Sequence, residues 1–186
     1  MNVFVLSTGR CGSTTFERAC RHITNYTCAH ESRISVVGPG RLDYPPNHIE
    51  SDNRLAWFLG RLHQRYPHDV FYVHLQRDRE AVARSYARRL EPGLIMSAYA
   101  HGVHLGLSDD IAPNALTIAR DYVDTVTANI EAFLADKPNR MTFHIENANV
   151  DFPRFWECVG AQGDRATAVA EFTIAYNAST QAPSRA

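Results

Sequence analysis

Apolar residues along this chain occur in short continuous runs that alternate with longer segments of helical periodicity. The clearest apolar runs are 2–6 and 70–76, the second rich in β-branched and aromatic residues, and both predict buried strands. Three more polar stretches, 25–32, 48–53 and 140–147, are further strand candidates. The pattern therefore predicts five strands spread along the whole chain.

Segments with helical periodicity separate these strands. They predict helices at 13–22, 53–67, 77–90, 114–137 and 151–161, with one or more short helices within 94–112. Ser13 or Thr14 is placed to cap the first helix, Asp78 is placed to cap the third, and Pro113 stands where a helix starts. Strands that alternate with helices predict an α/β domain of three layers, in which helices cover both faces of a mainly parallel sheet.

Length and composition are those of an ordinary globular domain. The 186 residues fit one domain, 1–186, whose tail from about residue 181 we expect to fray. The sequence holds no apolar run of about 18 residues and no signal-peptide pattern, so we expect a cytoplasmic protein outside the membrane. The net charge of −1 argues against nucleic acid as a partner. Four cysteines without ligand spacing favour reduced thiols over a metal site.

The segment "STGRCGSTTF" (7–16) follows the first strand directly and leads into the first helix. A glycine-bearing loop at a helix N-terminus is a typical anion site, because backbone N–H groups and the helix dipole point toward the ligand. Arg10 adds a cation, and Ser13, Thr14 and Thr15 add hydroxyl donors. The Walker pattern GxxxxGK[ST] is not met, because Ser13 follows Gly12 and the only lysine of the chain is Lys137.

A second polar cluster, "RDREAVARSY" (77–86), follows the strongest strand. It places Arg77 at the strand end and Ser85 about two helical turns further on. An arginine and a hydroxyl in this arrangement could bind a second phosphate, and a solvent-facing basic helix is the alternative interpretation. In parallel sheets, ligands bind at the carboxyl ends of the strands, where both clusters are expected.

Together these two segments resemble the family of sulfotransferases that use 3′-phosphoadenosine 5′-phosphosulfate (PAPS). "STGRCGSTTF" resembles the family's loop for the 5′-phosphosulfate, and "VFYVHLQRDREAVARSY" (70–86) resembles its motif for the 3′-phosphate. The resemblance covers about residues 2–90, with a weaker likeness at 143–161. It implies a P-loop NTPase-like fold, PAPS as sulfate donor, 3′-phosphoadenosine 5′-phosphate (PAP) as product, and no metal. The residues it implies for the donor are Arg10, Cys11, Gly12, Ser13, Thr14 and Thr15 at the 5′ end, and Arg77 and Ser85 at the 3′ end.

The implied reaction moves the sulfuryl group to an acceptor hydroxyl and needs a general base, with Arg10 neutralising charge on the transferring group. Glu31 lies 21 residues after Arg10 in "CAHESR" (28–33), a spacing and context similar to those of tyrosylprotein sulfotransferases. His48 lies near the position of the catalytic histidine of cytosolic sulfotransferases but lacks their K-x-H context. Glu31 is therefore favoured, with His48 second and Glu50, Asp52 and His30 after it; a surface carboxylate paired with Arg33 is the alternative interpretation of Glu31.

Two other functions remain open at this point. A P-loop nucleotide kinase or NTPase would share the architecture but would need the missing lysine and a way to hold Mg²⁺. A non-catalytic nucleotide-binding relative would keep the phosphate clusters and lose the base. The acceptor stays open among a sugar, a phenol, another small molecule and a peptide tyrosine. Trp57 and Trp156 are predicted to be core residues, and the "HGVH" pair His101 and His104 is interpreted as incidental.

Overall fold

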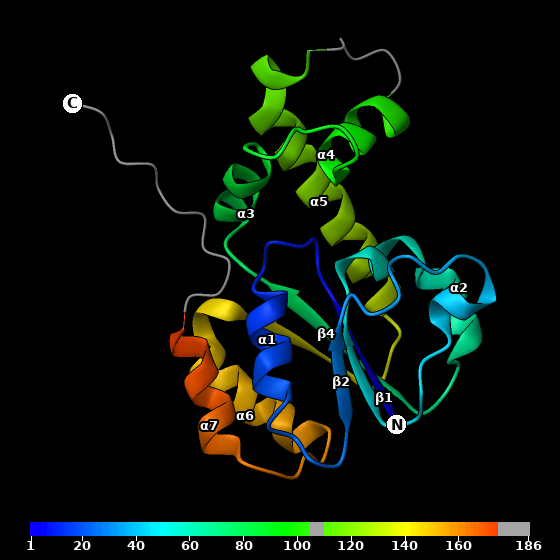
Figure 1. Ribbon diagram of the computed structural model, residues 1–186, viewed down its shortest axis with the longest axis vertical. Helices are drawn as coiled ribbons and strands as arrows, with labels where there is room; N and C mark the ends of the chain where they lie inside the picture. The colour runs from blue at the N-terminus through cyan, green and yellow to red at the C-terminus, as the bar shows by residue number, and fades with distance from the viewer. Residues whose placement is uncertain (105–109, 175–186) are drawn as a thin grey trace.

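The fold is built on one five-stranded sheet, all of whose strand pairs are parallel. The computed structural model describes residues 1–104 and 110–174. In spatial order the strands are β2-β3-β1-β4-β5 (Figure 1). Their bounds are β1 Asn2–Leu6, β2 Thr27–His30, β3 His48–Ser51, β4 Val70–Gln76 and β5 Arg140–His144. The five predicted strands are confirmed, and the sheet is parallel throughout.

Strand β1 lies at the centre of the sheet, where all five of its residues are buried and the four from Val3 to Leu6 are apolar. Val3 pairs in register with Ile49 of β3 on one side and with Phe71 of β4 on the other. The carboxyl ends of β1, β3 and β4 therefore meet at one edge of the sheet. The loops that leave this edge carry both polar clusters.

One face of the sheet is covered by α1 Ser13–Cys20, α6 Ala148–Cys158 and α7 Arg165–Ala170 (Figure 1). Phe16 of α1 is fully buried here, with its ring 5.0 Å from that of Phe143 and 5.1 Å from that of Phe155. These aromatic rings anchor α1 to β5 and α6. The start of α1 is therefore held by the core at the carboxyl edge of β1.

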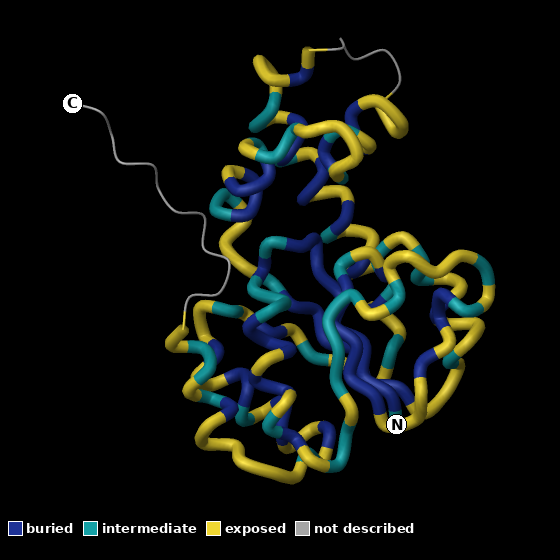
Figure 2. Tube along the Cα trace, in the orientation of Figure 1, coloured by how far each residue is buried: buried dark blue, intermediate teal, exposed yellow. Residues whose placement is uncertain are grey.

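The other face carries α2 Leu59–Arg65 and the long helix α5 Ala115–Leu134. The ring of Phe133 in α5 lies edge-on to Tyr72 of β4 at 5.2 Å. Helix α3 Arg79–Tyr86 packs on α5, and α4 Ile95–Ala98 and a π-helical turn, Tyr99–Val103, follow it beyond the carboxyl edge (Figure 1). Short 3₁₀ helices occupy Pro39–Leu42, Asn53–Trp57, Ala112–Asn114, Ile145–Asn147 and Glu171–Thr173. Figure 2 shows the buried residues concentrated in the sheet and the helix faces that cover it.

The structure corrects several expectations about the helices. The predicted helix 53–67 is two pieces, the 3₁₀ helix Asn53–Trp57 and α2, because Phe58 between them has a non-helical backbone with φ of −123°. Asp52 caps the first piece by accepting a hydrogen bond from the Arg54 N–H. Helix α1 begins after Gly12, which adopts a left-handed conformation, and neither Ser13 nor Thr14 caps it. Helix α7 lies beyond the segment predicted to be the last helix. The Asp78 cap is confirmed, since its carboxylate accepts from the Ala81 N–H.

The two tryptophans differ in their surroundings. Trp156 is buried as predicted, whereas Trp57 is 44% exposed, so its assignment to the core is wrong. The predicted fraying of the tail from residue 181 lies outside the described residues. Within residues 1–104 and 110–174, no helix combines the length and the apolar character needed to cross a bilayer. The predicted three-layer α/β architecture is consistent with this arrangement.

Candidate functional site

The loop between β1 and α1 has a backbone that most side chains would not allow. Gly9, Arg10 and Gly12 all have positive φ values, 86°, 60° and 88°. A Cβ atom on Gly9 would lie 2.2 Å from the hydroxyl oxygen of Tyr86, so glycine is required for space as well as for φ. Tyr86 and Tyr122 both donate a hydrogen bond to the Thr8 carbonyl, at 2.6 and 3.0 Å. The loop is thus fixed by α3 and α5.

Arg10 joins the two polar clusters, 7–16 and 77–86, that follow β1 and β4. Its Nε donates to the Oγ of Ser85 at 3.1 Å, across 75 residues of sequence. Arg77 donates from Nη1 to the Arg10 carbonyl at 3.3 Å. Burial, followed by repulsion from Arg89, lowers the pKa of the Arg10 guanidinium. Three arginines therefore gather beside the start of α1, where an anion would relieve their mutual repulsion.

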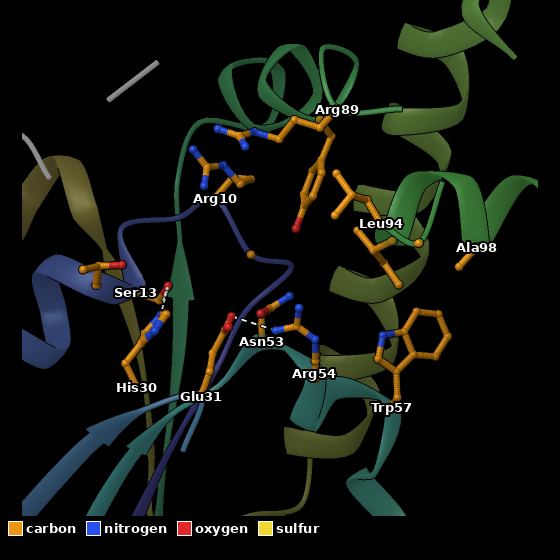
Figure 3. A pocket seen from close by; sticks show the side chains of 15 residues that line it. Arg10, Ser13, His30, Glu31, Asn53, Arg54, Trp57, Arg89, Leu94 and Ala98 are labelled. Carbon is orange, nitrogen blue, oxygen red and sulfur yellow. Dashed lines mark hydrogen bonds and ion pairs between the residues drawn. The ribbon is translucent and has the colours of Figure 1, made fainter. Parts of the chain in front are cut away.

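A cavity of about 410 Å³ opens beside this cluster at the carboxyl edge of the sheet (Figure 3). Its walls come from the β1–α1 loop and the first turn of α1, from the end of β2, from the 3₁₀ helix Asn53–Trp57, and from the segment between α3 and α4. The side chains of Arg10, Ser13, Glu31 and Arg54 are directed toward it (Figure 3). A cavity of this size falls near the lower end of the range of roughly 300–1,000 Å³ for small-molecule sites.

Glu31 and His30 reach the cavity from the end of β2. The carboxylate of Glu31 forms an ion pair with Nη1 of Arg54 at 2.9 Å, and its side chain is only a quarter exposed. The His30 Nε2 lies 2.9 Å from the Oγ of Ser13 (Figure 3). The partner of Glu31 is thus Arg54 rather than Arg33, which donates instead to the Gly40 carbonyl.

Backbone strain also gathers at this cavity. Four non-glycine residues in the described part of the chain have positive φ: Arg10, Glu31, Asn47 and Asp69. Asn and Asp tolerate this conformation, whereas Arg and Glu pay about 1–2 kcal/mol for it. Arg10 and Glu31 both line the cavity. Strain held at two charged side chains of one cavity is typical of a functional site.

His48 does not reach the cavity. It begins β3, at the opposite end of that strand from the site, and is buried. Its ring nitrogens lie 2.8 Å from the Thr27 hydroxyl and 3.0 Å from a carboxylate oxygen of Glu50, and the ring stacks on Tyr44. The structure therefore gives His48 the surroundings of a structural residue and separates it from Arg10 and Ser13.

Glu50 and Asp52 are likewise held in buried interactions. Burial opposes ionisation of Glu50, yet hydrogen bonds from His48 and Ser32 lower its pKa below the usual range. Burial raises the pKa of Asp52, although it pairs with Arg41 at 2.5 Å. Neither carboxylate lines the cavity. Among the candidate bases, Glu31 and His30 are the ones that the structure brings to it.

The remaining predicted donor residues differ in accessibility. The Cys11 thiol is turned into the protein, 3.3 Å from the Thr8 hydroxyl, and burial raises its pKa to about 11. Thr15 is buried in α1. Cys11 could therefore contact an anion through its backbone but not through its side chain. The backbone of Gly12 could do the same. Arg77 is exposed and borders a separate cavity of about 220 Å³ together with Thr8 and Cys11.

Several residues that line the cavity were not predicted from the sequence. Asn53 and Arg54 lie within three residues of the end of β3, so the rule that ligands bind where parallel strands end could have identified them. Arg89 also lines the cavity and lies within the helix predicted at 77–90, for which a solvent-facing basic helix was the alternative interpretation. Trp57 and Leu94 carry no local signal, because their role depends on which segments the fold brings together.

Comparisons with known proteins do not assign the chain to a family. No protein-family model matches it, and no curated protein matches it. Across residues 1–104 and 110–174, no group of three or more histidine, cysteine, aspartate or glutamate side chains is arranged to hold a metal ion.

Proposed function

We propose that this protein is a sulfotransferase that moves the sulfuryl group of PAPS to an acceptor hydroxyl. The observation that carries the proposal is the Nε–Oγ contact between Arg10 and Ser85. It joins the loop expected to hold the 5′-phosphosulfate to the motif expected to hold the 3′-phosphate. Both lie at the carboxyl edge of a parallel sheet, where ligands of such folds bind.

The donor-binding part of the site fits a ligand with several negative charges. The N-terminus of α1 presents backbone N–H groups that have no acceptor within the helix. Ser13 and Thr14 add hydroxyl groups, and Arg10 and Arg77 add fixed positive charge that can bind phosphate in a bidentate manner. PAPS supplies the sulfuryl group and a phosphate leaving group when bound. Arg10 neutralises the charge that develops as the bond between them breaks.

Glu31 is the general base in this proposal. It accepts the proton of the acceptor hydroxyl, whose oxygen then forms the new bond to sulfur. Support for Glu31 over His48 comes from location, because Glu31 lines the cavity and His48 lies at the far end of β3. The ion pair with Arg54 holds the Glu31 carboxylate at the cavity. His30, bonded to Ser13, is the second candidate at this position.

The choice of nucleotide tests the proposal against a P-loop kinase or NTPase. We expect PAP to raise the midpoint of thermal unfolding, whereas ATP with Mg²⁺ at the same concentration raises it much less. A ligand at one hundred times its Kd stabilises the folded state by about 2.7 kcal/mol, which is several degrees in a domain of this size. A larger shift with ATP and Mg²⁺ would overturn the proposal.

Transfer of a labelled sulfuryl group then separates an enzyme from a non-catalytic relative. Incubation with sulfur-labelled PAPS and a panel of sugars, phenols and tyrosine peptides should label at least one acceptor. Binding of PAP without transfer to any class of hydroxyl would favour the non-catalytic alternative.

A further inference from the structure

The cavity has two halves of different chemistry. One half is polar and contains Arg10, Ser13 and Glu31 (Figure 3). The other half is apolar and is formed by Trp57, Leu94, Ile95 and Ala98. In Figure 3, Arg54 lies between Glu31 and Trp57, so the candidate base stands beside the boundary of the two halves.

The apolar half contains two large side chains, Trp57 and Leu94, that are exposed rather than packed in the core. Trp57 is 44% exposed and Leu94 is 43% exposed, and they come from separate segments of the chain. The core beneath the 3₁₀ helix is filled by Leu55 and Leu62, both fully buried. Single exposed apolar residues are ordinary, but two that face one cavity indicate a surface that binds an apolar group.

We do not expect PAPS, the sulfate donor, to fill the apolar half of the cavity. Of the residues assigned to PAPS, only Arg10, Ser13 and Thr14 line the cavity, and all of them belong to the 5′ end. Arg77 and Ser85, assigned to the 3′-phosphate, are not among its lining residues. The phosphosulfate end would therefore enter from the polar side, and the apolar side would remain for the acceptor.

We propose, on the basis of the sulfotransferase function above, that the acceptor carries its hydroxyl on an aromatic ring and that Trp57 determines this specificity. A hydroxyl within reach of Glu31 directs the rest of the molecule across Arg54 to the indole face of Trp57. A flat ring buries apolar area on Trp57 and gains the additional stabilisation of aromatic pairs. A cavity of about 410 Å³, shared with the phosphosulfate, limits the acceptor to one or two rings.

A sugar fits this half less well. The four side chains of the apolar half offer one polar hydrogen, the indole N–H of Trp57. A sugar could lay one face on Trp57, but its hydroxyl groups that face Leu94, Ile95 and Ala98 would find no hydrogen-bond partner in those side chains. Unpaired buried hydroxyl groups oppose binding, so the cavity discriminates against sugars.

Calorimetric titration tests this inference. 2-Naphthol is the probe, decahydro-2-naphthol is its saturated counterpart, and methyl glucoside represents sugars. We expect 2-naphthol to bind best, and Trp57→Ala to weaken its binding by roughly tenfold, whereas Trp57→Phe retains most of it. Val150→Ala, which alters an exposed apolar residue of α6 away from the cavity, is the matched control and should change nothing. Stronger binding of methyl glucoside, or equal binding of 2-naphthol to Trp57→Ala and wild type, would overturn the inference.

Two further measurements show which proposal has failed, if one fails, and whether the aromatic acceptor is a small molecule or a peptide. PAP-induced stabilisation is measured on the same variants and should be unchanged by Trp57→Ala. If the wild-type protein bound PAP but not 2-naphthol, the acceptor class alone would be contradicted. If it bound 2-naphthol but not PAP, the sulfotransferase function would be contradicted and an aromatic subsite would remain. N-Acetyltyrosinamide carries the same kind of hydroxyl on a peptide unit. If N-acetyltyrosinamide bound more tightly than 2-naphthol, the result would support an aromatic acceptor that belongs to a peptide.

Discussion

The Nε of Arg10 donates a hydrogen bond to the Oγ of Ser85 at 3.1 Å, although 75 residues separate them in the sequence. The contact exists because β1 and β4 are neighbours in the sheet and both end at the same edge. It brings together the positive charge of one loop and the hydroxyl of a helix that follows another strand. Ser85 is buried, so this position of Arg10 is held from within the protein.

The Ser85→Ala variant should bind PAP about tenfold more weakly than wild type. The substitution removes the hydroxyl group that accepts the hydrogen bond from Arg10 and that is expected to contact the 3′-phosphate. Hydrogen bonds to charged groups contribute about 1.5–3 kcal/mol. Ser35→Ala, at an exposed position in a loop away from the site, is the matched control. Calorimetric titration with PAP measures the change. Equal affinity in Ser85→Ala and wild type would mean that the 3′-phosphate lies elsewhere.

The Arg77→Ala variant should lose discrimination for the 3′-phosphate. We expect it to lose roughly tenfold in affinity for PAP, whereas adenosine 5′-phosphosulfate, which has no 3′-phosphate, should bind it as it binds wild type. Arg88→Ala removes an exposed arginine just after α3 and serves as control. If Arg77→Ala weakened both nucleotides equally, Arg77 would contribute only general positive charge.

The Glu31→Gln variant should bind PAP normally and lose turnover by about 10²–10⁴-fold, because an amide cannot accept the acceptor's proton. Rapid-quench or steady-state transfer assays measure this at saturating PAPS. His48→Gln should lower the midpoint of thermal unfolding and leave turnover per folded molecule unchanged, since His48 bonds to Glu50 and Thr27 in the interior. Full activity in Glu31→Gln would transfer the role of base to His30.

The Gly9→Ala variant should destabilise the fold by roughly 2–4 kcal/mol. Its backbone has φ of 86°, and the added methyl group would collide with Tyr86 and Asn53. Gly60→Ala is a matched substitution within α2, where the added Cβ meets nothing within 4 Å. It should stabilise the fold by about 0.5–1 kcal/mol. Urea denaturation measures the change in the free energy of unfolding of each variant, which should be negative for Gly9→Ala and positive for Gly60→Ala. Similar changes in both variants would contradict the strained geometry of the loop.

The stability of the fold should fall on acidification because of His74. Burial, with a smaller contribution from His144, lowers the pKa of His74 to about 4 from its ordinary 6.5. Between these values the unfolded chain binds a proton that the folded chain does not, so unfolding becomes easier as the pH falls through this window. The loss attributable to His74 between pH 7 and pH 5 is about 2 kcal/mol.

Urea denaturation at pH 7 and pH 5 measures this dependence. His74→Gln should reduce the difference between the two pH values by about 2 kcal/mol. His63→Gln, which alters an exposed histidine of α2, should leave the difference as in wild type. Unchanged pH dependence in His74→Gln would show that His74 is already solvated in the folded protein.

The sequence by itself determined the strands, the parallel sheet and the loop at the start of α1. Continuous apolar runs such as 2–6 are buried wherever the chain folds, and Asp78 caps α3 through a contact with Ala81, three residues away. Such features depend on neighbours within a few positions, which are visible in the order of residues. Glu31 was identified by a spacing, and its place at the end of β2 follows from the strand prediction.

Only the tertiary structure decided which side chains meet around the cavity. The strand order β2-β3-β1-β4-β5 turns the end of β3 toward Arg10, which brings Arg54 to Glu31 and leaves His48 at the opposite end. Trp57 and Leu94 line the same cavity although they come from the 3₁₀ helix Asn53–Trp57 and the start of α4. These contacts join residues far apart in the chain, and their geometry is set by the packing of whole elements rather than by local periodicity. For that reason the proposal for the donor rests on sequence motifs, whereas the proposal for the acceptor class rests on the assembled cavity.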